Sequence, residues 1–116
     1  MKGEINKLAK QIETLCNERQ WGIYHTPKNI AVRLSIESSE LLEIFNWKNE
    51  EQSKELNDKD REKVINEVGD ITYNLINFCS KLGLDPIECC KQKLKDIESK
   101  YPVDKFKGKA NKYNEL

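Results

Sequence analysis

The sequence predicts an all-α protein, a four-helix up-and-down bundle with an irregular C-terminal tail. Three observations predict this fold. Apolar residues recur at steps of three and four in four separate segments. Cap residues followed by proline, typical of helix starts, open two of these segments. No segment alternates polar with apolar residues as a half-buried strand does. The chain has 116 residues, which leaves room for one core, so we expect a single domain over 1–116.

The first half of the chain is expected to hold two helices. The first covers residues 4–19, where one continuous apolar stripe follows the helical period. The second begins at Thr26-Pro27, because a threonine can cap the helix and a proline at the first helical position loses no hydrogen bond. This second helix is expected to continue to about Phe45 or Trp47.

The second half is expected to hold two further helices and a tail. A polar loop, 48–58, ends at a cap residue, Asn57 or Asp58. A glycine suited to a left-handed stop follows the third helix, and another cap-then-proline pair opens the fourth. The expected ranges are about 58–82 for the third helix, 86–100 for the fourth, and 103–116 for a tail without helical period.

Composition narrows the possible functions. The 20 basic and 20 acidic residues give a formal net charge of zero, so the chain lacks the basic excess of a protein that neutralises nucleic-acid phosphates. No apolar run approaches the roughly 20 residues of a membrane span, and the N-terminus lacks the apolar core of a signal peptide. The four cysteines show no metal-site spacing and are expected to be reduced. We therefore expect a cytoplasmic protein that binds neither nucleic acid nor membrane.

Two acid pairs stand out by position. Spacing alone is weak evidence, because acids three residues apart occur five times in this chain against about three expected by chance. Glu37 and Glu67, however, each interrupt an apolar stripe, and Glu40 has an isoleucine one turn to either side. A polar seam continues along the helix beyond Asp70. Residues three apart share a helix face, with Cβ atoms about 5–6 Å apart, so both pairs can converge on one point.

Four carboxylates at one point require compensation. Two like charges 4 Å apart repel by about 4 kcal/mol at an effective dielectric near 20. Oxygen ligands without cysteine or histidine favour a hard cation, Mg²⁺ first and Mn²⁺ second. A di-iron site would need a histidine on a helix, whereas the only histidine, His25, falls in an expected loop. The alternative is a buried salt-bridge network in which lysines or arginines from other helices neutralise the acids.

The acids and their surroundings resemble the MazG-like all-α nucleoside triphosphate pyrophosphohydrolases, in particular the dCTP pyrophosphatase branch. The metal motif of that family is similar to Glu37-x-x-Glu40 followed by Glu67-x-x-Asp70. The similarity extends in order over nearly the whole chain. The segments that carry it are 18–21, 24–30, 40–48, 100–102 and 107–113.

This resemblance implies a four-helix protein that assembles as a homodimer or homotetramer and hydrolyses nucleoside triphosphates with Mg²⁺ to a monophosphate and pyrophosphate. It assigns Glu37, Glu40, Glu67 and Asp70 as metal ligands. Either Glu37 or Glu40 would be the catalytic carboxylate that orients the attacking water. It suggests dCTP or a modified cytidine nucleotide as substrate and a role in controlling or cleaning the nucleotide pool.

The resemblance also suggests residues for substrate binding. Trp21 and Trp47 match aromatic residues that stack on the base, although either could simply anchor a helix end. His25 suits a phosphate-binding or loop-ordering role. Lys93 and Lys109 are the preferred lysines for the triphosphate.

Three departures from the branch fall at positions expected near the nucleoside. The departing residues are Ile12, Asn74 and Ile97. They bear on the base preference, and Asn74 is the one we expect to bind substrate.

Two alternative functions remain: a phosphoribosyl-ATP pyrophosphohydrolase-like enzyme, and a non-catalytic oligomerisation module with structural salt bridges.

Overall fold

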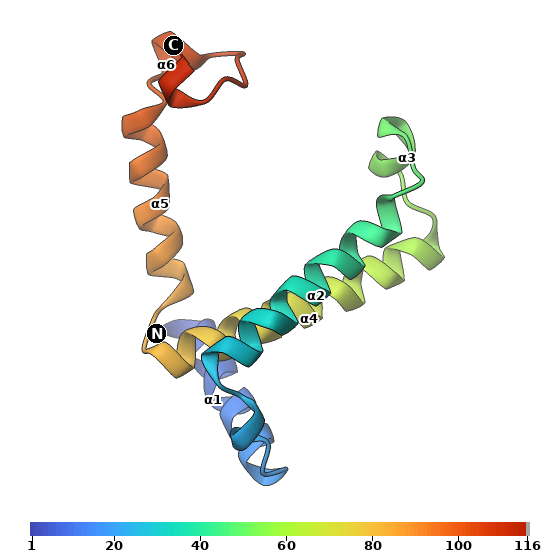
Figure 1. Ribbon diagram of the computed structural model, residues 1–116, viewed down its shortest axis with the longest axis vertical. Coiled ribbons are helices and arrows are strands. Elements are labelled where there is room, and N and C mark those ends of the chain that lie inside the picture. Colours follow the sequence, from blue (N-terminus) through green and yellow to red (C-terminus); the bar gives the residue numbers. More distant parts are fainter. Residues whose placement is uncertain (116) are drawn as a thin grey trace. The chain divides into compact units, whose positions relative to one another are not determined.

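The protein is helical throughout the part that the structure describes. A computed structural model describes residues 1–115 and divides into two compact units, Met1–Leu84 and Asp85–Leu116. Every regular element within residues 1–115 is a helix (Figure 1), which confirms the all-α class. A single domain over the whole chain stays a prediction. The four expected helices are all present, as α1 (Gly3–Glu18), α2 (Pro27–Phe45), α4 (Asp58–Leu82) and α5 (Pro86–Lys100).

The long helices begin and end where their cap residues predict. The Thr26 hydroxyl accepts a hydrogen bond from the Asn29 backbone N–H at 3.2 Å, and the Asn57 side chain accepts one from the Asp60 N–H at 2.8 Å. Both bonds satisfy N–H groups that a helix start leaves without partners. Gly83 ends α4 with φ 64°, a left-handed conformation that glycine adopts without steric cost.

The segments expected to be irregular contain short helices. The polar loop includes α3 (Glu50–Lys54), which starts at a reciprocal capping box: Asn49 and Gln52 each accept the other's backbone N–H at 2.9 Å. Within residues 103–115 the tail also contains two short helical turns and is irregular between them. One or two turns are too short for a hydrophobic period to register, so only local capping could have revealed them. The other short helices are η1 (Gly22–Tyr24), α6 (Val103–Phe106) and η2 (Tyr113–Glu115).

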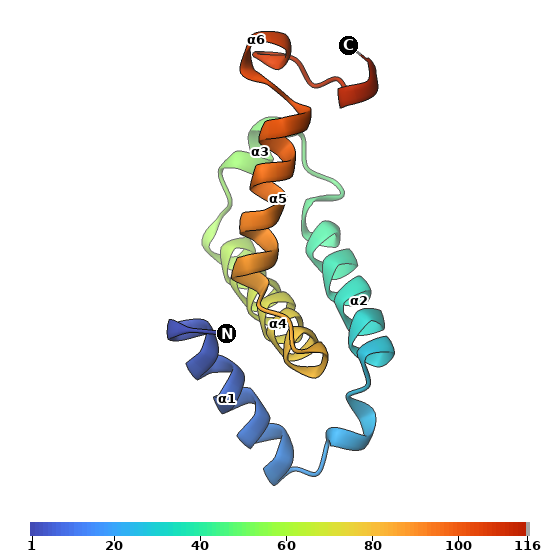
Figure 2. The same ribbon diagram turned by 90° about the vertical axis from the view of Figure 1, so that its left-hand side faces the viewer.

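In the first unit, α2 and α4 lie side by side and antiparallel, and α1 packs against α4 (Figures 1 and 2). An ion pair between Lys48 Nζ and Asp60 Oδ2, at 2.7 Å, joins the end of α2 to the first turn of α4. Few apolar side chains are fully buried, and those in this unit come from all three helices: Ala9, Cys16, Ile30, Ile76 and Cys79.

The second unit consists of α5, α6 and the residues after them. Among the described residues of this unit, the buried apolar side chain is Phe106, whose ring meets that of Tyr101 edge-on with centroids 4.8 Å apart. The apolar side chains of α5 are largely exposed, Leu94 at 55% among them. Among the described residues, no helix combines the length and the apolar character needed to cross a membrane.

Candidate metal centre

Three carboxylates from two helices converge on one point. Glu37 comes from α2, and Glu67 and Asp70 come from successive turns of α4. One oxygen of each lies within 4.8 Å of the others. Glu37 is only 3% exposed, whereas the two α4 acids are half-buried. The antiparallel packing of α2 on α4 therefore brings together acids that are 30 residues or more apart in sequence.

Two buried oxygens in this cluster lack a partner. Within residues 1–115, Oε2 of Glu37 and Oε2 of Glu67 are buried and accept no hydrogen bond. Burying a charged oxygen without compensation is costly, so such atoms are normally satisfied. A cation between the helices would satisfy both. An all-oxygen donor set of this kind fits Mg²⁺ or Mn²⁺.

The acids also disturb one another's protonation. Burial raises the pKa of Glu37, and the neighbouring carboxyl of Glu67 raises it further. The pKa of Glu40 is raised as well, first by the Glu37 carboxyl and its charge. Repulsion and burial both disfavour the charged form, as expected of a site that a cation completes. Glu40 is half-buried and does not belong to the group within 4.8 Å, so its role as a metal ligand stays a prediction.

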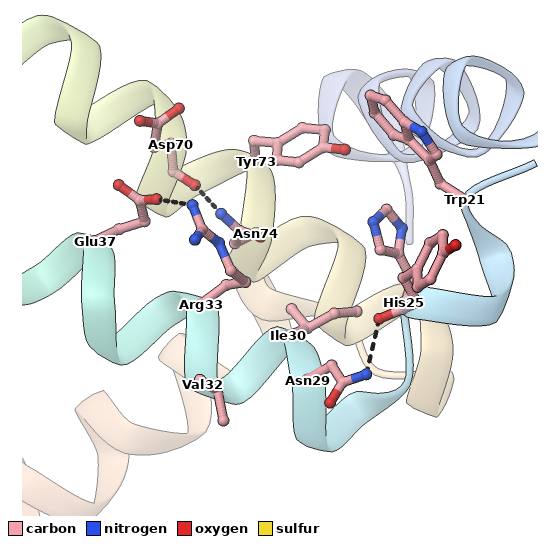
Figure 3. Close-up of a pocket in the computed structure, with 11 residues that line it drawn as sticks. Trp21, His25, Asn29, Ile30, Val32, Arg33, Glu37, Asp70, Tyr73 and Asn74 are labelled. Carbon is pink, nitrogen blue, oxygen red and sulfur yellow. Dashed lines mark hydrogen bonds and ion pairs between the residues drawn. The ribbon is translucent and has the colours of Figure 1, made fainter. Parts of the chain in front are cut away.

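One cation does reach the cluster. Arg33 donates from Nη2 to Oε1 of Glu37 at 2.5 Å (Figure 3). This pair lies within α2, whereas the salt-bridge alternative placed the basic partners on other helices. The sequence analysis missed Arg33. The signal was available, because a basic residue four positions before an acid lies on the same helix face.

A cavity of about 530 Å³ opens beside the cluster (Figure 3). Glu37 and Asp70 line it together with three residues that sequence analysis assigned to substrate binding, Trp21, His25 and Asn74. The cavity therefore joins the acids to the segment between α1 and α2. Its other lining residues are Tyr24, Asn29, Ile30, Val32, Arg33 and Tyr73.

The His25 imidazole is held by a hydrogen bond, and its surroundings disfavour its charged form. Asn77, a buried residue of α4, donates from Nδ2 to His25 Nδ1 at 3.3 Å. Burial lowers the pKa of His25, and the positive charge of Lys81 lowers it further. With Nδ1 accepting this bond, the ring can donate from Nε2, and its surroundings favour a role in ordering the loop over one as a cation that pairs with phosphate. The Trp21 ring meets it edge-on, with centroids 6.2 Å apart.

Part of the cavity wall comes from α4, through Tyr73 and Asn74. The Tyr73 hydroxyl lies 3.4 Å from Cys16 Sγ, and burial together with that thiol raises the pKa of Tyr73 to about 12. Asn74 donates from Nδ2 to the backbone carbonyl of Asp70 at 2.8 Å. Of the three departures from the branch, Asn74 thus lines the cavity, Ile12 is not among the lining residues, and Ile97 lies in the second unit.

Three other expected substrate residues are not among those that line this cavity within its own unit. Trp47 is 95% exposed and lines a separate hollow beside α3. Lys93 and Lys109 belong to the second unit, where Lys93 pairs with Asp96 at 3.3 Å. Roles for these three residues stay predictions.

A second hollow, of about 760 Å³, lies on the other side of the acids. Glu40 and Glu67 line it, with Lys59 and Lys63 from the first two turns of α4. Glu43 and Glu62 also line this hollow, so the acidic cluster borders a cavity rich in aromatic and amide groups and a hollow of mixed charge.

Comparisons with known proteins agree with this geometry. The sequence profile of the MazG-like family matches residues 32–116. Over 101 residues the chain is 30% identical to dCTP pyrophosphatase 1 of Bos taurus and 26% identical to that of Homo sapiens. Each match covers 85% of this chain but 60% and 59% of the relative, so the chain spans about three-fifths of the length of these curated relatives.

A solved structure is similar over almost its full length. The crystal structure of a pyrophosphatase from Archaeoglobus fulgidus matches with a TM-score of 0.81 at 35% sequence identity. The match covers 88% of this chain and 95% of that one.

Proposed function

The chain belongs to the MazG-like family, and on that premise we propose that it is a Mg²⁺-dependent nucleoside triphosphate pyrophosphohydrolase. The products would be a nucleoside monophosphate and pyrophosphate. One observation carries the proposal: three carboxylates within 4.8 Å of one another, two of them with a buried oxygen that lacks a partner among the described residues, at the wall of a cavity of about 530 Å³.

Glu37, Glu67 and Asp70 would hold the metal ion, with Glu40 as a further ligand. Bound Mg²⁺ supplies positive charge to the phosphate oxygens and lowers the pKa of water. Glu37 already shares one oxygen with Arg33, and its other oxygen is buried and has no hydrogen-bond partner among the described residues. Glu40 is half-buried and reaches the second hollow, so we assign it, ahead of Glu37, as the catalytic residue that orients the attacking water.

The nucleoside would occupy the 530 Å³ cavity. Trp21 is 40% exposed and offers a ring face for stacking on a base. His25 and Asn74 offer hydrogen bonds beside it. Because the named relatives are dCTP pyrophosphatases, dCTP or a modified cytidine nucleotide is the first substrate to test. A role in pool sanitation follows from such a substrate.

The phosphate chain would cross the acidic cluster toward the second hollow. Lys59 and Lys63 line that hollow and can neutralise phosphate charge. The hollow also carries Glu43 and Glu62, so the orientation rests on the stacking aromatic at the base end and on the metal site between the two ends.

We also propose that the chain acts as a homodimer or homotetramer. Apolar side chains of the two central helices face outward, including Leu42 and Ile65 at 61% each and Val68 at 49%. A second copy would cover such surface. Trp47 would then serve a nucleotide bound by a neighbouring copy. Light scattering coupled to gel filtration measures the assembly, and a monomer at micromolar concentration would contradict this proposal.

The experiment for the activity is a panel of nucleoside triphosphates with Mg²⁺ or Mn²⁺, with pyrophosphate and monophosphate both quantified. Turnover of at least one nucleotide, lost in EDTA, is expected. Glu40→Gln and Asp70→Asn should abolish turnover with helicity intact, while Glu13→Gln, at an exposed position on α1, should retain it. Absence of turnover with every nucleotide would leave the non-catalytic module as the better explanation. Selective cleavage of phosphoribosyl-ATP would favour the other alternative.

A further inference from the structure

Glu37 uses its two carboxylate oxygens differently. Oε1 accepts the Arg33 hydrogen bond at 2.5 Å, whereas Oε2 is buried and has no partner within residues 1–115. Glu37 is also the one residue that α2 contributes to the group of three acids within 4.8 Å. One oxygen thus belongs to an internal contact, and the other is left for whatever fills the cluster.

The contact is strongly asymmetric in burial. The Arg33 side chain is 57% exposed and that of Glu37 is 4% exposed. An exposed pair one helical turn apart contributes little to stability. Here, however, a planar guanidinium that lines the cavity reaches inward to the most buried acid of the cluster (Figure 3). A guanidinium donates in a fixed planar geometry, so it restricts how the carboxylate plane can turn.

We propose that Arg33 is a positioning residue for the metal ion: by binding Oε1 of Glu37 it keeps Oε2 turned toward Glu67 and Asp70. The inference rests on the proposed function, since it assumes a divalent cation at this cluster. Groups that hydrogen-bond a metal-ligating side chain commonly change metal affinity by about 10- to 100-fold when they are removed.

Whether removal of Arg33 weakens or tightens metal binding distinguishes a positioning role from that of a simple counter-charge. Arg33 carries a positive charge next to a cation site, so its charge alone opposes metal binding. If Arg33 only neutralised the acids, its removal would tighten metal binding. If it positions Glu37, its removal weakens binding even though a repelling charge is lost.

The experiment is a calorimetric titration of the metal-free protein with Mn²⁺. Arg33→Met should weaken the affinity about tenfold or more. Arg33→Lys, which keeps a donor near Glu37, should recover part of the loss. The matched control is Arg61→Met, at an exposed position in the first turn of α4, which should bind like the wild type. Circular dichroism and elution volume verify that each variant keeps its helicity and assembly.

A second readout uses the Mg²⁺ dependence of turnover. The Mg²⁺ concentration for half-maximal rate, measured at saturating nucleotide, should rise about tenfold in Arg33→Met. Unchanged or tighter Mn²⁺ binding in Arg33→Met would overturn the inference. If that variant fails to fold, Arg33→Gln takes its place under the same criterion. A wild-type chain that binds no Mn²⁺ would instead refute the proposed function itself.

Discussion

Replacing Glu37 with glutamine should make the metal-free protein more stable. Glutamine keeps the shape of the side chain and an oxygen that can accept the Arg33 hydrogen bond, but it removes one charge from the cluster. The change therefore isolates the electrostatic cost of holding acids together without an ion. A carboxylate that serves only the fold would respond in the opposite direction.

The magnitude follows from the distances. The acid oxygens lie within 4.8 Å of one another, and at that upper limit two unit charges repel by about 3.5 kcal/mol at an effective dielectric of 20 and by about 1 kcal/mol in bulk water. Glu37 has two such neighbours, Glu67 and Asp70, and the half-exposed Arg33 offsets roughly one of them. Glu37→Gln should accordingly stabilise the metal-free protein by about 1–3 kcal/mol, or about 4 °C in melting temperature for each kcal/mol.

The assay is thermal unfolding in EDTA and in excess Mg²⁺, at one protein concentration because the melting temperature of an oligomer depends on it. Mg²⁺ at 100 times its dissociation constant would add about 2.7 kcal/mol to the wild type. Glu37→Gln should gain much less stability from Mg²⁺. Its stability advantage over the wild type in EDTA should therefore shrink or reverse in Mg²⁺. Glu13→Gln on α1 is the matched control and should change stability by no more than about 0.5 kcal/mol.

One result would refute this reasoning. If Glu37→Gln lowers the stability in EDTA by more than about 1 kcal/mol, the Arg33–Glu37 ion pair is worth more to the fold than the repulsion costs. The cluster would then be a structural salt-bridge site, and the metal assignment would lose its physical basis.

Three further predictions concern pH and the cavity. Because burial and Glu67 raise the pKa of Glu37 above its ordinary 4.5, the native state binds a proton that the unfolded state lacks, so the metal-free protein should gain stability as the pH falls from neutral toward 4.5. The lowered pKa of His25 acts in the opposite direction below its ordinary 6.5. Urea midpoints should therefore be compared with those of Glu37→Gln, which keeps His25, and equal pH slopes would contradict the prediction. Asn74→Tyr should change the relative kcat/KM among bases, and an identical substrate profile would exclude Asn74 from base recognition. Trp21→Ala should raise KM about 5- to 100-fold, matching the loss of one base–aromatic stack, and an unchanged KM would place the base elsewhere.

The helices were predictable because their determinants are local. The cap at Thr26, the cap at Asn57 and the left-handed stop at Gly83 each act on backbone groups within four residues, so the sequence contains all the information needed. The periodic spacing of apolar residues predicted the helices between these ends. The short helix Glu50–Lys54 escaped because five residues make little more than one turn, too few to show a period.

The position of the acids was partly predictable. Glu37 interrupts an apolar stripe in the sequence and is buried in the structure, as that interruption predicts. The same argument placed Glu40 in the cluster as an equal member, whereas the structure leaves it half-buried and outside the group within 4.8 Å. The sequence pattern indicates which face of a helix a residue occupies. Metal coordination depends on where individual oxygen atoms lie, which the pattern does not give.

By itself, the sequence determined the helix boundaries, the four acids on facing helices and the family resemblance, all of which depend on residue type and order. Only the tertiary structure decided that Glu37 meets Glu67 and Asp70, that Arg33 binds the buried acid, and that Trp47 lies away from the cavity. These contacts depend on how far each helix is rotated about its own axis and on the side-chain rotamers. Neither quantity follows from spacing along the chain, because they are set by the packing of α2 on α4.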